Sequence, residues 1–255
     1  MTSQPTSRPE KMPSVFVGVG GPRQIWDDEW NGKLHGWAES MPKPEAILMF
    51  SAHWTRFPIT LGARKQVPLT YDYYNFPKHF YEVQYPAPPS PSLADRFVEL
   101  MGDKLDIYGS DRGLDHGAFI GLMGMYPEHD VPVLQVSIPT FEPEMLFELG
   151  RALSPLRKEG VMVMGAGLLT HSGESKEANH AFDAWVMDRL EKRDNESLFK
   201  YEEIAPGVKQ ALPTVEHFVP LLVAYGAAYD DNAGMLTGVE NAPDATGTRR
   251  SLQFN

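Results

Sequence analysis

The chain has 255 residues, of which 42% are hydrophobic and 22% charged, proportions that are ordinary for a globular protein. Its formal net charge of −11 argues against a nucleic-acid partner, because phosphate binding needs a basic surface. The absence of cysteine excludes disulfides, thiolate metal sites and cysteine nucleophiles.

The N-terminal segment and the apolar runs bear on the location of the protein. Residues 1–12 are polar and lack the apolar core of a signal peptide, so we expect a disordered leader and a cytoplasmic protein. No stretch of 18 apolar residues occurs, and we therefore expect neither a spanning helix nor a membrane partner.

Strand patterns alternate with helix patterns along the rest of the chain. Residues 15–22 predict a short buried strand that runs into a glycine-rich turn, and residues 25–37 predict a helix with an aromatic stripe that includes Trp26. Further strands are predicted at 46–54, 59–62, 131–138, 161–164 and in the tail 235–254, with helices at 90–101, 143–158, 178–193 and 220–225. This order predicts one α/β domain over residues 13–255, with a central, mostly parallel or mixed sheet flanked by helices.

Four of the eight histidines follow or precede apolar segments: His53, His116, His171 and His217. Ligands of open α/β sheets gather beyond the strand ends, so we expect these imidazoles to share a site. Neutral imidazoles bind Zn(II) or Fe(II), and non-haem iron needs about three protein ligands with open positions for substrate and oxygen. A histidine outside the coordination shell can move protons.

Two common hydrolase patterns are absent from the sequence. Ser172 follows His171, but no Gly-x-Ser-x-Gly elbow occurs. The segment that ends at His217 lacks the first histidine of a His-Glu-x-x-His helix.

Five motifs occur in the order typical of one known family. They are residues 51–54 (SAHW), 75–77 (NFP), 85–88 (YPAP), 115–117 (DHG) and 214–222 (TVEHFVPLL). With these motifs the chain resembles the class III extradiol ring-cleavage dioxygenases, in the branch that includes the DOPA 4,5-dioxygenases. The resemblance runs from about residue 15 to the C-terminus.

The resemblance implies an α/β domain in which a catechol chelates a non-haem Fe(II), although zinc can occupy the same site. Dioxygen binds beside the catechol, and the ring is cut next to its two hydroxyls to give a semialdehyde. By position, His53 and His217 resemble the metal ligands and His171 the acid–base histidine outside the shell. His116 resembles a pocket residue that orients the substrate or an intermediate.

The sequence departs from the family pattern at the first metal ligand. The family has a histidine within a Gly-His-Gly-Ser-Pro turn, whereas here the turn contains Val19, which has no lone pair for a metal. In the aromatic loop the family's His-Asp pair is replaced by Tyr71 and Asp72. Loss of a ligand is expected to lower the metal affinity by at least the roughly 10–100-fold that follows loss of a supporting residue.

Three interpretations of this departure stay open. In the first, another side chain completes an Fe(II) or Zn(II) site and the protein cleaves aromatic rings; the candidates near in sequence are Asp27, Asp28, Glu29, His35 and Glu216. In the second, no metal is bound and the histidines perform acid–base chemistry, such as carbon–carbon bond hydrolysis or isomerisation of a phenolic or ring-derived acid. In the third, the protein is a non-catalytic relative that binds a small molecule.

A small aromatic ligand is common to the enzymatic interpretations, with dioxygen as a second substrate in the first. Trp54 and the aromatic residues of the long loop 68–91 have apolar bodies with polar tips, which suits a phenol-binding wall. We therefore expect Tyr71, Trp54 and Phe76 to bind substrate.

Overall fold

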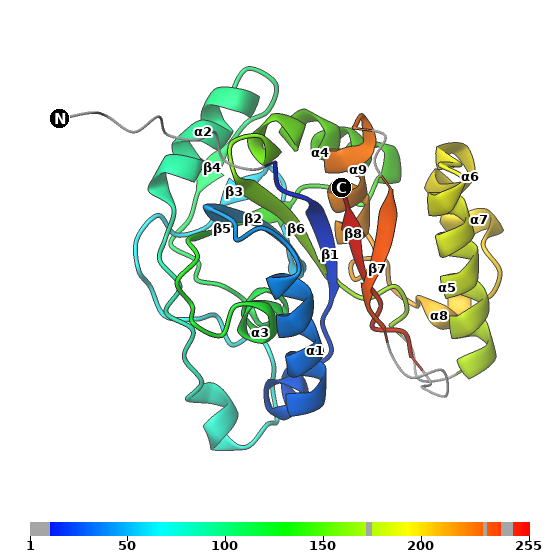
Figure 1. Cartoon of the computed structure of the whole chain (residues 1–255), viewed down its shortest axis with the longest axis horizontal. Coiled ribbons are helices and arrows are strands. Elements are labelled where there is room, and N and C mark those ends of the chain that lie inside the picture. The colour runs from blue at the N-terminus through cyan, green and yellow to red at the C-terminus, as the bar shows by residue number, and fades with distance from the viewer. Residues whose placement is uncertain (1–10, 172–174, 232–233, 241–246) are drawn as a thin grey trace.

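The computed structural model describes residues 11–171, 175–231, 234–240 and 247–255 (Figure 1). A mixed sheet runs through them in the order β4-β3-β5-β2-β6-β1-β8-β7. Its strands are β1 (Ser14–Gly18), β2 (Ala46–Thr55), β3 (Thr60–Leu61), β4 (Tyr108–Gly109), β5 (Val133–Ile138), β6 (Val161–Gly167), β7 (Met235–Val239) and β8 (Ser251–Phe254). The predicted α/β class with a mixed sheet is therefore confirmed.

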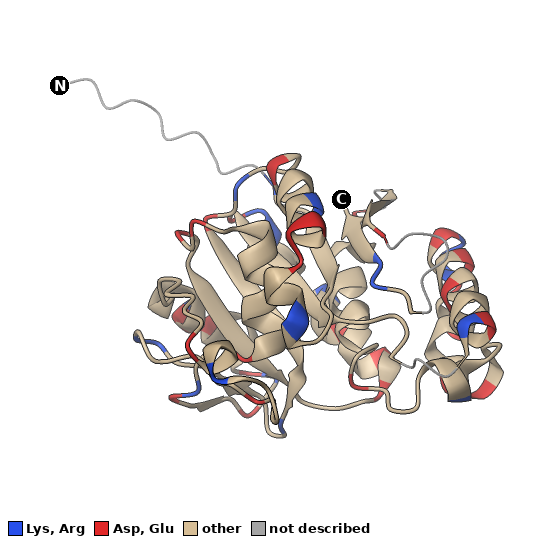
Figure 2. Ribbon diagram, turned by 90° about the horizontal axis from the view of Figure 1, so that it is seen from below, with Lys and Arg blue, Asp and Glu red and all other residues tan. Residues whose placement is uncertain are grey.

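Helices flank this sheet on both sides. They are α1 (Asp28–Glu39), α2 (Pro91–Met101), α3 (His116–Met125), α4 (Pro143–Arg157), α5 (Lys176–Glu191), α6 (Asn195–Phe199), α7 (Tyr201–Ile204), α8 (Val208–Ala211) and α9 (Pro220–Tyr229), with 3₁₀ helices at Pro22–Trp26 and Lys78–Tyr81. Acidic and basic residues are interspersed along the outer helices (Figure 2). Within the described ranges, no helix is both long enough and apolar enough to cross a bilayer.

The centre of the sheet is parallel. β2 pairs in parallel with β5 and β6, and β6 pairs in parallel with β1. The carboxyl ends of these four strands therefore lie along one edge, which is where ligands of open α/β sheets bind. Antiparallel pairing begins outside this centre, where β8 joins β1 and β3 joins β5.

The two faces of the sheet carry separate apolar cores. Along β2, Leu48 and Phe50 face the core formed with α2, α4, α5 and α9, while Ile47 and Met49 face the core formed with α1 and α3. This alternation follows from the two-residue period of a strand. Because both faces are covered, the strand is apolar along most of its length, as expected for a central parallel strand.

The start of the first helix differs from the prediction. The stretch from Pro22 to Trp26 is a 3₁₀ helix, and α1 begins only at Asp28. Asp27 is the N-cap of α1, and its carboxylate accepts a hydrogen bond from the backbone N–H of Trp30. This capping bond starts a new helix axis, so Trp26 is 48% exposed instead of lying on the buried stripe.

Only the end of the predicted leader falls in the described part of the chain. The prediction for residues 1–10 lies outside the described residues, but Met12 is buried. Its backbone N–H donates to the carbonyl of Arg157, and its own carbonyl accepts from the Arg157 guanidinium. The prediction that residue 12 belongs to a disordered leader is therefore wrong.

Helices α4 and α9 pack closely because a glycine faces the crossing. A Cβ atom at Gly150 would collide with the carbonyl oxygen of Val223 and lie 2.9 Å from the amide nitrogen of Ala227. Both contacts are to backbone, which cannot move as easily as a side chain.

We predict that Gly150→Ala lowers the free energy of unfolding by about 1–3 kcal/mol, because the added methyl overpacks the α4–α9 interface. Urea unfolding followed by circular dichroism measures the change. Gly36→Ala is the control, because Gly36 is exposed on α1 and a methyl group added there would meet no neighbouring segment within 4 Å. It should leave stability unchanged or raise it by about 0.5–1 kcal/mol. Equal effects of the two variants would contradict the interpretation.

Candidate active site

Four histidines from distant parts of the sequence lie together at the carboxyl edge of the parallel strands. His53 lies near the end of β2, His116 is the first residue of α3, His171 follows β6 and His217 precedes α9. The ring centres of His53 and His116 are 3.8 Å apart, and those of His53 and His217 are 4.9 Å apart. The rings of His171 and His217 stack at 3.6 Å with an angle of 12° between their planes.

Two glycines make this crowding possible. A Cβ atom at Gly117 would collide with the Ser51 hydroxyl and lie 2.8 Å from Cδ2 of His53. A Cβ atom at Gly167 would collide with the carbonyl of His217, which accepts a hydrogen bond from the backbone N–H of Leu168 at 2.8 Å. Each glycine therefore allows one segment of backbone to approach a histidine more closely than any other residue would.

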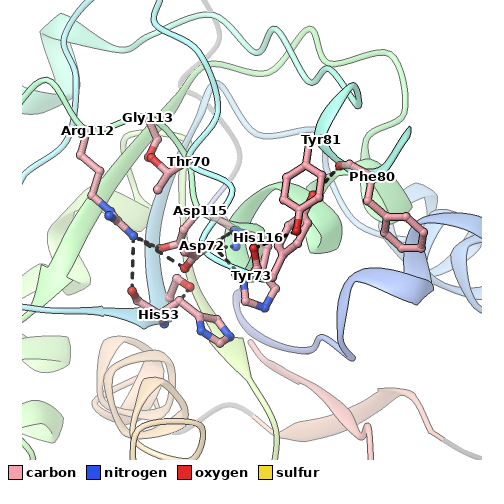
Figure 3. Close-up of polar contacts among 12 residues, drawn as sticks. His53, Thr70, Asp72, Tyr73, Phe80, Tyr81, Arg112, Gly113, Asp115 and His116 are labelled. Atoms are coloured by element: carbon pink, nitrogen blue, oxygen red, sulfur yellow. Dashed lines mark hydrogen bonds and ion pairs between the residues drawn. The ribbon is translucent and has the colours of Figure 1, made fainter. Parts of the chain in front are cut away.

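Asp72 joins the long aromatic loop to His116 (Figure 3). Its Oδ1 accepts a hydrogen bond from the His116 backbone N–H at 3.1 Å and lies 2.9 Å from Nδ1 of the same residue. Thr70 brings the loop into place, since its backbone N–H donates to the carbonyl of Leu114 and its hydroxyl donates to that of Gly113.

Arg112 and Asp115 hold Asp72 and His53 in place (Figure 3). The Arg112 guanidinium lies 3.7 Å from Asp72, 3.6 Å from Asp115 and donates to the carbonyl of His53 at 3.4 Å. Asp115 is fully buried, caps α3 by accepting from the backbone N–H of Ala118, and also accepts from the Gln135 amide. Arg112 and Asp115 form an ion pair, and together they hold the carbonyl of His53 and the start of α3.

A second carboxylate supports His217. The Glu216 Oε1 lies 3.1 Å from Nδ1 of His217 and accepts a hydrogen bond from the Thr214 hydroxyl at 2.8 Å. Because an ionised carboxylate only accepts, Nδ1 carries the hydrogen and Nε2 of His217 keeps its lone pair.

Burial keeps the clustered imidazoles neutral. Desolvation, together with the charges of His116 and His217, lowers the pKa of His53 to about 3. Desolvation and the neighbouring His171 lower the pKa of His217 to about 4, although Glu216 opposes this. Desolvation also lowers the pKa of His171. At pH 7 these groups are therefore able to accept a proton or bind a metal.

The two aspartates of the network differ in pKa. Burial opposes the ionisation of Asp72, but hydrogen bonds from His116 outweigh it and lower its pKa. Burial and the charge of Asp72 raise the pKa of Asp115. Asp72 is consequently the carboxylate that is available as an anion next to the histidines.

Val19 supplies no donor at the remaining position of the family-like site. It is buried, its backbone N–H donates to the carbonyl of Gly167, and its Cγ2 lies 3.0 Å from where a Cβ of Gly121 would be. The side chain therefore belongs to the apolar core against α3. Of the donors that the resemblance implies for a metal, only His53 and His217 are present.

Other groups of donors in the described residues could hold an ion. One comprises His53, Asp72 and His116, which we call the His53 triad, and the other comprises His171, Glu216 and His217, which we call the His217 cluster; within each group the donor atoms lie within 4.8 Å of one another. A divalent cation thus fits the chemistry of this pocket through a donor set that differs from the expected one.

The suggested replacement ligands are mostly engaged elsewhere. Asp27 caps α1 and pairs with Arg249, Glu29 pairs with Lys33, and Nδ1 of His35 lies 3.2 Å from the carbonyl of Met125. Asp28 is exposed in the first turn of α1. Glu216, beside His217, is the one of the five candidates for which the structure records a contact with one of the four histidines.

The predicted substrate-binding aromatics occupy three different places. The Tyr71 hydroxyl donates to the carbonyl of Val83, and its ring contacts Tyr73 and Phe119 at 6.1 Å. Phe76 packs on Tyr73 at 5.4 Å, and Tyr73 in turn meets the ring of His116 edge-on at 5.5 Å. Tyr73 therefore links Tyr71 and Phe76 to the ring of His116.

Trp54 occupies the third place, next to His53 in sequence. Successive side chains of a strand point to opposite faces, and the ring of Trp54 lies 5.5 Å from the Arg112 guanidinium. Trp54 therefore contacts Arg112, which holds His53 and Asp72 in place. Its role in substrate binding stays a prediction.

The sequence patterns indicate no role for Arg112, Asp115 and Gln135, and Asp72 occurs only in a changed motif. Asp115 stands beside His116 in a motif, which is the available signal. The others come from a loop and from the interior of β5, and no local pattern marks them as partners of a histidine.

Comparison with known proteins gives the family. The family model of the catalytic LigB subunit of aromatic ring-opening dioxygenase matches residues 13–244. The chain belongs to the LigB family. A protein named 4,5-DOPA dioxygenase extradiol from Beta vulgaris is 38% identical over 88% of this chain and 89% of its own length. One of the same name from Escherichia coli K12 is 34% identical over 85% of each chain.

The fold of this LigB-family protein also matches a solved structure. The crystal structure of an uncharacterized protein, JW3007, from Escherichia coli K12 superposes with a TM-score of 0.77 at 28% identity. The match covers 96% of this chain and all of the other. The family predicted from the five motifs is thus confirmed.

We predict that acid destabilises the metal-free protein through His53 and His217. Unfolded histidine has a pKa near 6.5, so below this pH the unfolded chain takes up protons that the folded imidazoles do not. Their contribution to stability is complete above about pH 7 and is lost as the pH falls toward 4. Melting temperatures in the presence of a chelator, measured from pH 8 to pH 4, follow this loss.

His53→Gln should show a shallower decline, because glutamine does not titrate. His129→Asn, at an exposed turn position with positive φ, is the control and should follow the parent profile. An acid limb of unchanged steepness in His53→Gln would contradict the assignment.

Proposed function

We propose that this LigB-family protein is a ring-cleaving dioxygenase that acts on a catechol. The observation that carries the proposal is the gathering of His53, His116, His171 and His217 at one edge of the sheet in a chain of this family. The names of its relatives favour a DOPA-like catechol as the substrate.

A divalent metal ion would supply binding positions for the catechol oxygens and for dioxygen when bound in this pocket. The donors on offer are the imidazole of His53, with either His217 or the Asp72–His116 pair beside it. Two imidazoles on one ion have ring centres roughly 5 Å apart, given metal–nitrogen bonds of about 2.1 Å, and His53 and His217 are 4.9 Å apart.

His171 is the residue we assign to proton transfer. It stacks on His217 at the exposed side of the cluster, and burial lowers its pKa, so it is neutral at pH 7. A neutral imidazole can accept the proton of a catechol hydroxyl and return it later in the reaction. Glu216 holds His217 in the orientation on which this stacking depends.

The aromatic loop would provide the wall for the catechol ring. Tyr73 lies edge-on to His116, and Tyr71 and Phe76 extend the wall away from the histidines. Desolvation raises the pKa of Tyr73 to about 12, so its phenol stays protonated beside the substrate. A catechol ring packed against this wall would be shielded from water.

We predict that His171→Ala lowers kcat for DOPA about 10²–10⁴-fold, the range typical for loss of a general acid–base group. The affinity for Co(II) should change less than threefold, because His171 acts on substrate protons in this proposal. The protein is reconstituted with Fe(II) under anaerobic conditions and mixed with aerated DOPA or catechol. Oxygen consumption and the yellow semialdehyde then report turnover.

His129→Asn serves again as a control and should retain parental turnover, since His129 lies at an exposed turn. The proposal is abandoned if the Fe(II)-loaded parent protein consumes no oxygen with either substrate. It is also abandoned if His171→Ala turns over at the parental rate.

A metal-free acid–base enzyme is the second candidate, because Val19 removes a metal donor while two carboxylate–imidazole pairs remain. Such pairs can move protons on a phenolic or ring-derived acid without oxygen. Turnover of such an acid that persists under argon and in excess chelator would favour this candidate. Binding of a catechol without turnover in any of these conditions would leave the non-catalytic relative.

A further inference from the structure

A second cavity, of about 280 Å³, lies at the end of α9 that is remote from the histidines. His217 precedes the first turn of α9, whereas Tyr225 and Tyr229, in its last turns, line this cavity. A helix of this length spans roughly 15 Å. The cavity is therefore a separate place from the candidate active site.

The wall of this cavity is mostly apolar and aromatic. The ring centre of Tyr225 lies 5.4 Å from that of Tyr229 and 5.5 Å from that of Phe254, and Leu190 and Met235 complete the apolar lining. Small-molecule sites are typically apolar pockets with a few polar groups. Because an apolar cavity of about 150 Å³ holds benzene, this one has room for an aromatic ring and a short polar chain.

Arg193 supplies a positive charge at this wall. Its guanidinium lies 3.9 Å from the ring centre of Tyr229 and donates one hydrogen bond, at 2.6 Å, to the carbonyl of the same residue. A guanidinium has five N–H donors, and a carboxylate can accept two of them at once. Arg189 on the same helix end pairs with Asp188 and Asp194, but no carboxylate of the described residues pairs with Arg193.

The backbone of Arg193 has a conformation that glycine usually adopts. The residue follows the C-cap of α5 with φ of 53°, in the left-handed region. A side chain there costs strain that glycine would avoid. The guanidinium is nevertheless held over Tyr229, between the ends of α5 and α9.

Glu191 brings a negative charge to the same cavity. It is exposed and lines the cavity with Arg193, and it forms no ion pair within the ranges that the structure describes. Lys192, between the two in sequence, pairs with Asp188 instead. One unpaired charge of each sign beside an aromatic wall matches a ligand that carries a carboxylate, an ammonium group and an aromatic ring.

We propose that this cavity is a binding site for an aromatic amino acid. The carboxylate of the ligand binds the Arg193 guanidinium, its ammonium group lies toward Glu191, and its ring packs against Tyr225 and Phe254. The inference goes beyond the proposed dioxygenase function, because the site contains none of the histidines. Binding is measured without metal or turnover, so either proposal can fail while the other stands.

The test begins with calorimetric titration of the full chain in the presence of a chelator. L-phenylalanine is the probe, because it has no catechol oxygens to bring it to the histidines. The parent should bind about one equivalent. Phenethylamine, which lacks the carboxylate, should bind about 10–100-fold more weakly, the range for loss of a hydrogen bond to a charged group. 3-Phenylpropionate, which lacks the ammonium group, should bind about 2–5-fold more weakly, because Glu191 is exposed to water.

Variants assign the binding to this cavity. Arg193→Gly should weaken phenylalanine binding by about 10–100-fold, and its fold should be kept because glycine suits the left-handed position. Glu191→Gln should weaken binding by about 2–5-fold. Lys192→Gln is the matched control from the same segment and should bind as the parent does. His53→Gln should also bind as the parent does, because it changes only the catalytic pocket.

Circular dichroism verifies the fold of each variant, and a crystal of the parent soaked with phenylalanine provides a test that needs no variant. Density for the ligand should lie between Arg193 and Tyr225. The proposal is overturned if the parent shows no saturable binding, or if the density lies at the histidines. Loss of binding in His53→Gln with full binding in Arg193→Gly would overturn it as well, as would equal affinity for phenylalanine and phenethylamine.

Discussion

The close packing of four imidazoles constrains everything around them. Burial, together with ring centres only 3.6–4.9 Å apart, disfavours positive charge on these rings and lowers the pKa of His53 and His217. Neutral rings need partners for their N–H groups, and Asp72 and Glu216 provide them. The same neutrality makes these rings competent as metal ligands and as bases, so packing and chemistry have one cause.

The fold and the family were predictable because their signals are local. Apolar segments such as β2 and β6 mark buried strands, and parallel pairing places the residues after them on one edge. The placement of His53 and His171 on one edge follows from that rule, whereas His217 reaches the same edge from the segment before α9. The start of α1 was not predictable to the residue, because the choice between one helix and two depended on a single capping bond, which the backbone N–H of Trp30 donates to Asp27.

The contacts that hold the histidines in place could not be predicted in the same way. Arg112 meets His53 across 59 positions of sequence, and Asp72 meets His116 across 44. Such contacts depend on how a long loop lies over the sheet, which here is decided by the bridge between Thr70 and the segment before α3. Composition and periodicity carry no information about that path, since any polar residue of the loop is equally compatible with them.

The change at Val19 shows why a site is better judged by its donors than by its motif. Valine joins the apolar core against Gly121, so the position contributes burial and no lone pair. A motif comparison would count one ligand lost and two retained. The structure adds a carboxylate and an imidazole beside His53, whose hydrogen-bonded atoms lie 2.9 Å apart. Because metal affinity depends on the number, spacing and direction of donor atoms, each of these groups is judged by its contacts, and the nitrogen and oxygen of this pair already share a hydrogen.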